Sequence, residues 1–337
     1  MERFQWAQAR TLEEVQEQVS ATTAELTSGQ KNKDTSIIKA GGVDLLDLMK
    51  EGIASPDKVI DIKAIPGMQI LTYDEKKGLR IGAGVTLSKV LKQKEVKEKY
   101  RALYEAISHA ATPQIRNMAT MGGNMAQRPK CWYFRSENHH CKKKGGDVCF
   151  AQTGQNDIHA IYNTKICPCV HSSSVATALI ALDASIEYLD QNEKLQTIPL
   201  ADFFILPDVD VTRENILQLK EVITALILPV PKSNTKSYYI KQGARESYDW
   251  ALADVAVVLS MNGNTCEKAT IVLGAAAPNP YRAVQAEKLL QGSLIDEEIA
   301  AKAAEKELQS AVPLAGNQYK IPMFKAIIKN CILKTIS

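Results

Sequence analysis

Five of the seven cysteines of this 337-residue chain lie close together in the sequence. They are Cys131, Cys141, Cys149, Cys167 and Cys169. The segment around them has little apolar periodicity and many turn-forming residues, which predicts a loop of roughly 40 residues with no helix of its own. Loops of this length are uncommon in compact domains unless something organises them. Four thiolates around a metal ion or an iron–sulfur cluster could do so.

The spacing of these cysteines favours an iron–sulfur cluster over zinc. Structural zinc usually takes its ligands in short C-x₂₋₄-C pairs. Here the intervals are 10, 8 and 18 or 20 residues, and only Cys167 and Cys169 are near neighbours. A 4Fe–4S cluster accepts four thiolates from varied spacings. Zinc and free thiols remain open alternatives from spacing alone. A local basic excess would partly offset the thiolate charge: Arg128, Lys130, Arg135, Lys142, Lys143 and Lys144 against Glu137 and Asp147.

Two Gly-Gly motifs could supply a second kind of chemistry. KAGGVDL, at 39–45, follows a short β-branched stretch, and IRNMATMGGN, at 115–124, leads into the cysteine segment. Adjacent glycines let successive backbone N–H groups point into one concavity, and such nests bind phosphate oxygens. Thr120 and Asn124 could add hydrogen bonds to a sugar or a phosphate. The alternative is that both motifs are ordinary turns.

A mixture of helices and strands must position these segments. A capping box, Thr11 with Glu14, predicts a helix to about Thr27. Helical patterns run from Leu87 to about Ala111, with an interruption in the charged stretch KQKEVKEKY. Strands are predicted at Ser36–Lys39, Lys58–Ile62, Ile70–Tyr73, Leu79–Gly84, Ser185–Leu189, Ser237–Gln242, Ala253–Met261 and Ala269–Ala276. Further helices are predicted at Val175–Asp183 and at about Val284–Gln291, Asp296–Leu308 and Ile321–Lys334.

The overall composition excludes several classes of protein. Apolar residues make up 45% of the chain and charged residues 23%, which is typical of a globular protein. A net charge of +3 is too balanced for a dedicated nucleic-acid binder. An odd number of cysteines argues against a secreted disulfide framework, and Cys266 and Cys331 are predicted as small core residues. Neither a signal peptide nor a membrane span is predicted, so a cytoplasmic location is expected.

Longer stretches of the sequence resemble a known family. KAGGVDLLDLMK, LRIGAGVTLSKV and ATPQIRNMATMGGNMA, in this order and spacing, resemble the flavoprotein (medium) subunits of molybdenum hydroxylases, the xanthine, aldehyde and carbon monoxide dehydrogenase type. ALIALDASIEY, KQGARESYDWALADVAV and NQYKIPMFKAIIKNCIL extend the resemblance over essentially the whole chain. The insertion that begins RPKCWYFR resembles the branch with an additional 4Fe–4S cluster, as in periplasmic aldehyde oxidoreductase and 4-hydroxybenzoyl-CoA reductase.

The resemblance implies an α+β fold with two domains. A bipartite FAD-binding domain of the PCMH type would span 1–228, with the iron–sulfur insertion at about 128–170. A small α+β domain with a three-stranded antiparallel sheet and helices would span 229–337.

The same resemblance implies the residues that hold the cofactors. The cluster ligands would be Cys131, Cys141, Cys149 and Cys167, with Cys169 as the alternative fourth ligand. Family members commonly have Ser-Asp where this chain has Ser173-Ser174, so a hydroxyl replaces a carboxylate near the flavin ribityl chain. FAD would contact Ala40, Gly41, Gly42, Val43, Asp44, Leu45, Thr120, Gly122, Gly123, Asn124 and Ser174, with Lys241 and Asp249 near the flavin or an inter-subunit face.

The function implied is electron transfer through FAD and a 4Fe–4S cluster, in a complex with a molybdopterin-binding large subunit and a 2Fe–2S small subunit. An external carrier such as ferredoxin would exchange electrons with it. No catalytic side chain, nucleic-acid partner or membrane span is expected. Two alternatives are a stand-alone flavin oxidoreductase and a zinc-stabilised docking module without a redox role.

Overall fold

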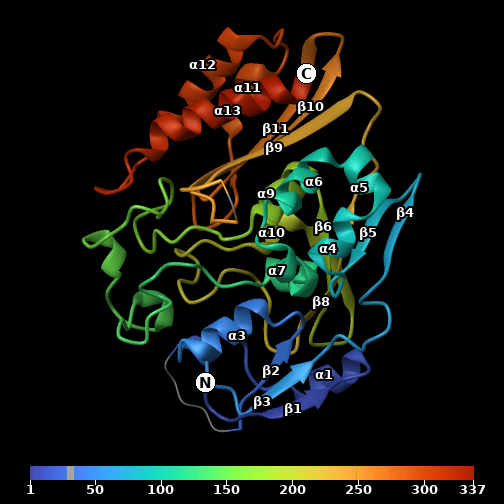
Figure 1. The fold of residues 1–337 in the computed structure, drawn as a ribbon, viewed down its shortest axis with the longest axis vertical. Coiled ribbons are helices and arrows are strands. Elements are labelled where there is room, and N and C mark those ends of the chain that lie inside the picture. The colour runs from blue at the N-terminus through green and yellow to red at the C-terminus, as the bar shows by residue number, and fades with distance from the viewer. Residues whose placement is uncertain (29–33, 247) are drawn as a thin grey trace.

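The computed structural model describes residues 1–28, 34–246 and 248–337, and Figure 1 shows them from the N-terminal end at the bottom to the C-terminal helices at the top. The first sheet is parallel, in the order β1-β3-β2. Its strands are β1 (Gln5–Gln8), β2 (Ser36–Lys39) and β3 (Lys58–Asp61). Its helices are α1 (Leu12–Gln18), α2 (Thr23–Thr27) and α3 (Val43–Lys50).

The single helix predicted to reach Thr27 is two helices in the structure. The Thr11 hydroxyl accepts a hydrogen bond from the Glu14 N–H, as the capping box predicts, and Thr22 caps α2 in the same way. Between them, the N–H groups of Ser20 and Ala21 donate to the carbonyl of Ser36. The chain is therefore extended beside β2 there, and this tertiary pairing breaks the helix.

The second sheet has the order β4-β5-β8-β6-β7 and is antiparallel. Its strands are β4 (Leu71–Asp74), β5 (Gly78–Gly82), β6 (Ser185–Leu189), β7 (Leu195–Pro199) and β8 (Val222–Leu228). The interrupted helical stretch forms α4 (Leu87–Leu91), α5 (Lys94–Lys99) and α6 (Arg101–Ser108). It is followed by α7 (Pro113–Met118), α8 (Met121–Met125), α9 (Ser174–Ala181) and α10 (Leu200–Phe203).

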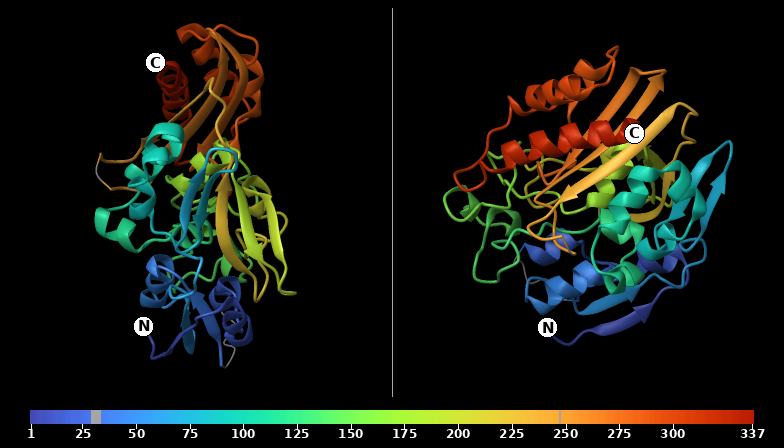
Figure 2. Two further views of the ribbon diagram at one scale, coloured as in Figure 1. Left: turned by 90° about the vertical axis from the view of Figure 1, so that its right-hand side faces the viewer. Right: turned by 45° about the horizontal axis from the view of Figure 1, so that its top comes forward.

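The third sheet is antiparallel and has four strands, one more than predicted, in the order β12-β11-β10-β9. They are β9 (Thr235–Gln242), β10 (Ala253–Asn262), β11 (Thr265–Gly274) and β12 (Tyr281–Arg282). A two-residue strand has no periodic pattern, so β12 could not be recognised. Helices α11 (Val284–Leu290), α12 (Glu297–Leu308) and α13 (Lys320–Ile336) cover one face of this sheet, and Figure 2 shows α13 across the strands.

The other face of the third sheet packs on α6 and α9, so the small sheet and the preceding part of the chain share one core. Side chains of β10 alternate between the two faces as a strand requires. Val255, Val257 and Leu259 belong to the core under α11–α13, while Ala256 belongs to the core shared with α9.

The cysteine segment is a loop, as predicted, with only two short 3₁₀ turns, Lys142–Lys144 and Phe150–Gln152. It forms the green lobe beside α3 in Figure 1. Phe134 and Cys141 of the loop share a small apolar core with Leu45 and Leu48 of α3. In the part of the chain that the structure describes, no helix has the length and apolar character to cross a membrane.

Candidate functional site

A cavity of about 370 Å³ lies between the end of β2 with helix α3, helices α7, α8 and α9, and the loop that follows β9. Its volume is within the range of about 300–1,000 Å³ that is usual for small-molecule sites. Every residue predicted to contact FAD lines it except Gly122, which lines a neighbouring cavity of about 200 Å³. The two cavities share Ala40, Gly123 and Ala126, among others, so one elongated ligand could occupy both.

The first Gly-Gly motif forms the turn between β2 and α3. Gly42 has a φ of 78°, which a side chain would strain, and it precedes the first residue of α3. A Cβ atom on Gly41 would lie 2.1 Å from the carbonyl oxygen of Met118, so this glycine lets the two motifs touch through their backbones. The backbone N–H groups from Gly41 to Leu45 donate no hydrogen bond to any acceptor among the described residues. This row of N–H groups at a helix start suits a phosphate.

The second Gly-Gly motif lies inside α8, capped by the Thr120 hydroxyl, which accepts from the Gly123 N–H at 3.3 Å. The Gly122 N–H donates to the carbonyl of Ala83 at 2.8 Å, and that of Asn124 donates to the carbonyl of Thr120 at 2.8 Å. These N–H groups therefore already have protein acceptors, unlike the row from Gly41 to Leu45, and the contact of this motif with FAD stays a prediction. Gly122 also serves packing, since its Cβ would lie 2.7 Å from that of Ala83.

Asp44 anchors the cysteine segment to α3. Its carboxylate accepts hydrogen bonds from Lys130 Nζ at 2.6 Å, Arg135 Nη2 at 2.7 Å and the Arg128 N–H at 2.8 Å. Burial would raise the pKa of Asp44, but the charges of Lys130 and Arg135 outweigh it and hold the pKa below its ordinary value. Asp44 lines the cavity as predicted, yet its carboxylate is engaged by the segment that carries the cysteines.

We expect Asp44→Asn to lower the free energy of unfolding at pH 7 by about 2 kcal/mol, because hydrogen bonds to a charged group contribute about 1.5–3 kcal/mol. A lowered pKa contributes stability above the unfolded-state pKa, and that stability is lost as the pH falls through the folded-state pKa. The variant should therefore lose less stability than the wild type when acidified. Urea unfolding at pH 7 and pH 4 measures both effects. Asp202→Asn, at an exposed position of α10, should change neither.

The far end of the cavity is formed by the loop between β9 and β10. Lys241 Nζ donates to the carbonyls of His109 at 2.6 Å and of Asp249 at 2.7 Å, which ties this loop to the end of α6. Tyr248 and Trp250 also line the cavity, and both are more than half exposed. The sequence analysis did not single out these two rings. Ser174, at the first position of α9, lies in the wall with Asn124.

All five clustered cysteines line one narrow cavity in the loop. Hydrogen bonds from the thiols of Cys149 and Cys169, with the nearby charge of Lys143, hold the pKa of Cys167 well below its ordinary value. The contact with Cys167 and burial raise the pKa of Cys169. His159, which the sequence analysis missed, places its Nε2 atom 3.2 Å from Cys131 Sγ.

Within residues 1–28, 34–246 and 248–337, no group of three or more His, Cys, Asp or Glu side chains is arranged to hold a metal ion. The 4Fe–4S cluster expected from the sequence therefore stays a prediction.

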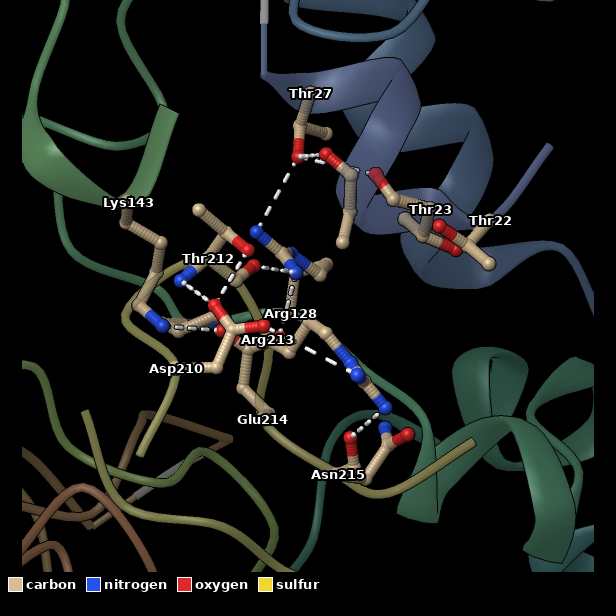
Figure 3. Close-up of polar contacts among 12 residues, drawn as sticks. Thr22, Thr23, Thr27, Arg128, Lys143, Asp210, Thr212, Arg213, Glu214 and Asn215 are labelled. Carbon is tan, nitrogen blue, oxygen red and sulfur yellow. Dashed lines mark hydrogen bonds and ion pairs between the residues drawn. The ribbon is translucent and has the colours of Figure 1, made fainter. Parts of the chain in front are cut away.

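A buried group of charges, which was not anticipated from the sequence, lies between the cavity of about 200 Å³ and the cysteine cavity. The Glu214 carboxylate accepts from Lys143 Nζ at 2.6 Å and from Arg128 Nη1 at 2.8 Å. All three side chains are at most 6% exposed. Figure 3 shows Arg128 between Glu214 and Thr27, whose hydroxyl accepts from Arg128 Nη2. Arg128 and Lys143 thus share the single carboxylate of Glu214, which leaves one positive charge in excess. Because Lys143 also lines the cysteine cavity, this excess charge lies near the thiols.

Two family models match this chain. Residues 2–231 match the FAD binding domain in molybdopterin dehydrogenase, and residues 238–335 match the CO dehydrogenase flavoprotein C-terminal domain. The chain is 33% identical to the aldehyde oxidoreductase FAD-binding subunit of Escherichia coli K12, over 94% of this chain and 96% of that one. It is 27% identical to the carbon monoxide dehydrogenase medium chain of Hydrogenophaga pseudoflava, over 90% of each chain.

Solved structures show the same fold. The carbon monoxide dehydrogenase of Hydrogenophaga pseudoflava matches with a TM-score of 0.74 and 24% identity, over 99% of this chain and 98% of that one. Quinoline 2-oxidoreductase of Pseudomonas putida 86 matches with a TM-score of 0.72 and 22% identity, over 99% and 97% of the two chains. The expected α+β fold is confirmed.

Proposed function

Because this chain belongs to the family of FAD-binding medium subunits of molybdenum hydroxylases, the xanthine, aldehyde and carbon monoxide dehydrogenase type, we propose that it transfers electrons between a molybdenum-containing partner and an external carrier. The observation that carries this proposal is the cavity in which both family motifs meet, where the N–H groups from Gly41 to Leu45 donate to no acceptor among the described residues.

We assign the FAD pyrophosphate to the N–H groups of Gly41 to Leu45. The shared wall of the two cavities, with Ala40, Thr120, Gly123 and Asn124, would enclose the middle of the cofactor. One end would extend past Gly122 and the other past Ser174 toward Lys241 and Asp249. Asp44 and Lys241 would hold the loops around the cofactor, since their polar groups are already paired. When bound, FAD would supply the redox chemistry, since it can take up two electrons together and release them one at a time.

We propose Cys131, Cys141, Cys149 and Cys167 as ligands of a 4Fe–4S cluster. The shared cavity supports this set, because all four thiols line it and could reach one cluster there. Cys169 lines the same cavity and is the alternative fourth ligand. A cluster of this type supplies one-electron transfer. Lys143 would face its negative charge, and His159 would lie beside one ligand.

The partners proposed are a molybdopterin-binding large subunit and a 2Fe–2S small subunit, because relatives of this chain are named medium chains or medium subunits. A ferredoxin or a similar carrier would be the external partner. We propose residues 1–228 as the FAD-binding domain, with the insertion at about 128–170, and 229–337 as the C-terminal domain. Cysteine thiols persist in reducing compartments, so we propose a cytoplasmic location.

The test begins with anaerobic purification and measurement of flavin absorbance, iron and acid-labile sulfide. We expect Cys149→Ser to lose iron and sulfide but to retain FAD, because the proposed phosphate site is a different turn. Cys266→Ser, at a buried cysteine of β11 under the C-terminal helices, is the matched control and should retain both. Protein that contains neither flavin nor iron would refute the proposal, and stoichiometric zinc would favour the docking module instead.

A further inference from the structure

A carboxyl group lies buried behind the wall of the large cavity. Asp254, near the start of β10, is 2% exposed. It stands opposite Gly274 of β11, where a Cβ atom would lie 2.0 Å from Asp254 Oδ1. Only a glycine at this position leaves room for the carboxyl group, which therefore occupies a specific niche in the sheet. Nothing in the proposed cofactor site makes use of this group.

Tyr239 and Ser174 connect this carboxyl group to the cavity. The Tyr239 hydroxyl, which is fully buried, faces both the Asp254 carboxyl and the Ser174 hydroxyl, and Ser174 lines the cavity. Among the described residues, neither the Tyr239 hydroxyl nor Asp254 Oδ1 completes a hydrogen bond. A buried polar atom without a partner is unfavourable by about 1–3 kcal/mol, so such atoms call for an explanation, and a redox role is one of them.

Two lysines and a threonine complete the surroundings of Asp254. Lys241 is its neighbour on β9, Lys320 approaches from α13, and Thr177 faces it from α9. Lys241 Nζ is bonded to two backbone carbonyls, and so is Lys320 Nζ, which donates to His159 at 3.0 Å and to Ala275 at 2.6 Å. Among the described residues neither lysine lies within ion-pair distance of Asp254, so their charges favour its carboxylate form less strongly than burial disfavours it. Burial accordingly raises the pKa of Asp254 to about 7.

We propose that Asp254 is a redox-linked proton site, which binds a proton from the cavity through Ser174 and Tyr239 when electrons arrive there and releases it when they leave. This inference rests on the proposed binding of FAD in this cavity. An iron–sulfur centre of the proposed partner would supply the electrons. Each pair that enters adds negative charge near the wall, which disfavours the carboxylate form of Asp254.

The proton balance of this step is simple. A proton from the cavity passes to Ser174 Oγ as the Ser174 proton passes to the Tyr239 oxygen, and the Tyr239 proton bonds to the Asp254 carboxylate. The carboxylate becomes a carboxylic acid and both hydroxyls are restored. When the electrons leave to the external carrier, the same bonds form and break in reverse. No other oxidant or reductant takes part.

The test is the number of protons taken up per two electrons. Purified FAD-loaded protein is photoreduced at pH 7 in weakly buffered solution that contains a pH-indicator dye. We expect Asp254→Asn to take up fewer protons than the wild type, by up to one per two electrons. Its flavin midpoint potential should also fall less steeply with pH, by up to about 30 mV per pH unit, the value for one proton per two electrons.

Glu307→Gln is the matched control. Glu307 is 1% exposed, and its carboxylate accepts from the N–H groups of Gln285 and Ala286 under the helices of the C-terminal part, so uptake should be unchanged. Tyr239→Phe should slow proton uptake and leave its amount unchanged. Equal uptake and equal potentials in Asp254→Asn and the wild type would overturn the inference. If Asp254→Asn does not fold, an unchanged rate in Tyr239→Phe would overturn it. Protein without flavin would refute the cofactor assignment and this inference together.

Discussion

Replacement of Gly41 by alanine should leave the protein folded but largely without FAD. The added methyl group would lie 2.1 Å from the carbonyl oxygen of Met118 and 3.2 Å from the Thr120 nitrogen. Both are backbone atoms that no side-chain rotation can move, so the turn itself must shift. That turn carries the N–H groups assigned to the pyrophosphate, and each hydrogen bond to a charged group contributes about 1.5–3 kcal/mol.

Loss of one or two of these bonds corresponds to a fall in FAD affinity of at least about tenfold to a hundredfold. Titration of apoprotein with FAD, followed by flavin fluorescence, gives the dissociation constants. Gly263→Ala is the control, because Gly263 lies in the turn between β10 and β11 with open space around it and a φ of 57°. It should destabilise the protein by about 1 kcal/mol and leave FAD affinity unchanged. Unchanged affinity in Gly41→Ala would place the pyrophosphate elsewhere.

The two Gly-Gly motifs illustrate what a sequence can reveal about a site. Both were recognisable because glycine is required where backbones approach closely, and this requirement is local. Whether the N–H groups are available to a ligand depends on partners far along the chain. The N–H of Gly122 donates to Ala83, 39 positions earlier, and no feature of the motif itself indicates this bond. The sequence could therefore single out this motif, but it could not show which of its N–H groups have partners in the folded chain.

The buried charges were missed for a related reason. Lys143 lies in a run of three lysines, which is typical of a solvated surface, yet it is buried against a glutamate 71 positions away. Asp254, in contrast, could have been recognised from the sequence. A single carboxyl group within the apolar stretch ALADVAVVL is unfavourable in a buried strand unless it has a purpose. A search for lone charges inside predicted strands would have found it.

The fold was predictable where periodicity is strong. Strands β9, β10 and β11 were expected close to their positions, because their apolar residues recur with the period of a strand. Strands β1, β7 and β12 were missed, since they have only two to five residues and partly exposed patterns. The break between α1 and α2 depends on hydrogen bonds to β2, which helix propensity does not report.

Glu214→Ala should lower the free energy of unfolding by about 3–5 kcal/mol, the loss that is typical when one partner of a buried ion pair is removed. The substitution would leave Arg128 and Lys143 buried with two positive charges and no carboxylate between them. Urea unfolding measures this loss. Glu298→Ala, which removes an exposed pair with Lys302, should change stability by about 0.5 kcal/mol at most and is the control.

Lys143→Met should behave differently, because it removes the surplus cation and leaves Arg128 and Glu214 paired one to one. In iron-free protein we expect a change within about 1 kcal/mol, because Arg128 still pairs with Glu214 and the substitution leaves neither of these buried charges without a partner. In iron-loaded protein the loss of unfolding free energy should be larger, because the positive charge of Lys143 would then offset the negative charge of the thiolate ligands. Urea unfolding of Lys143→Met and Glu214→Ala, each with and without iron, separates the contribution of the ion pair from that of the cluster. Equal losses for Lys143→Met with and without iron would show that its charge serves only Glu214, and would remove one support for a cluster in this loop.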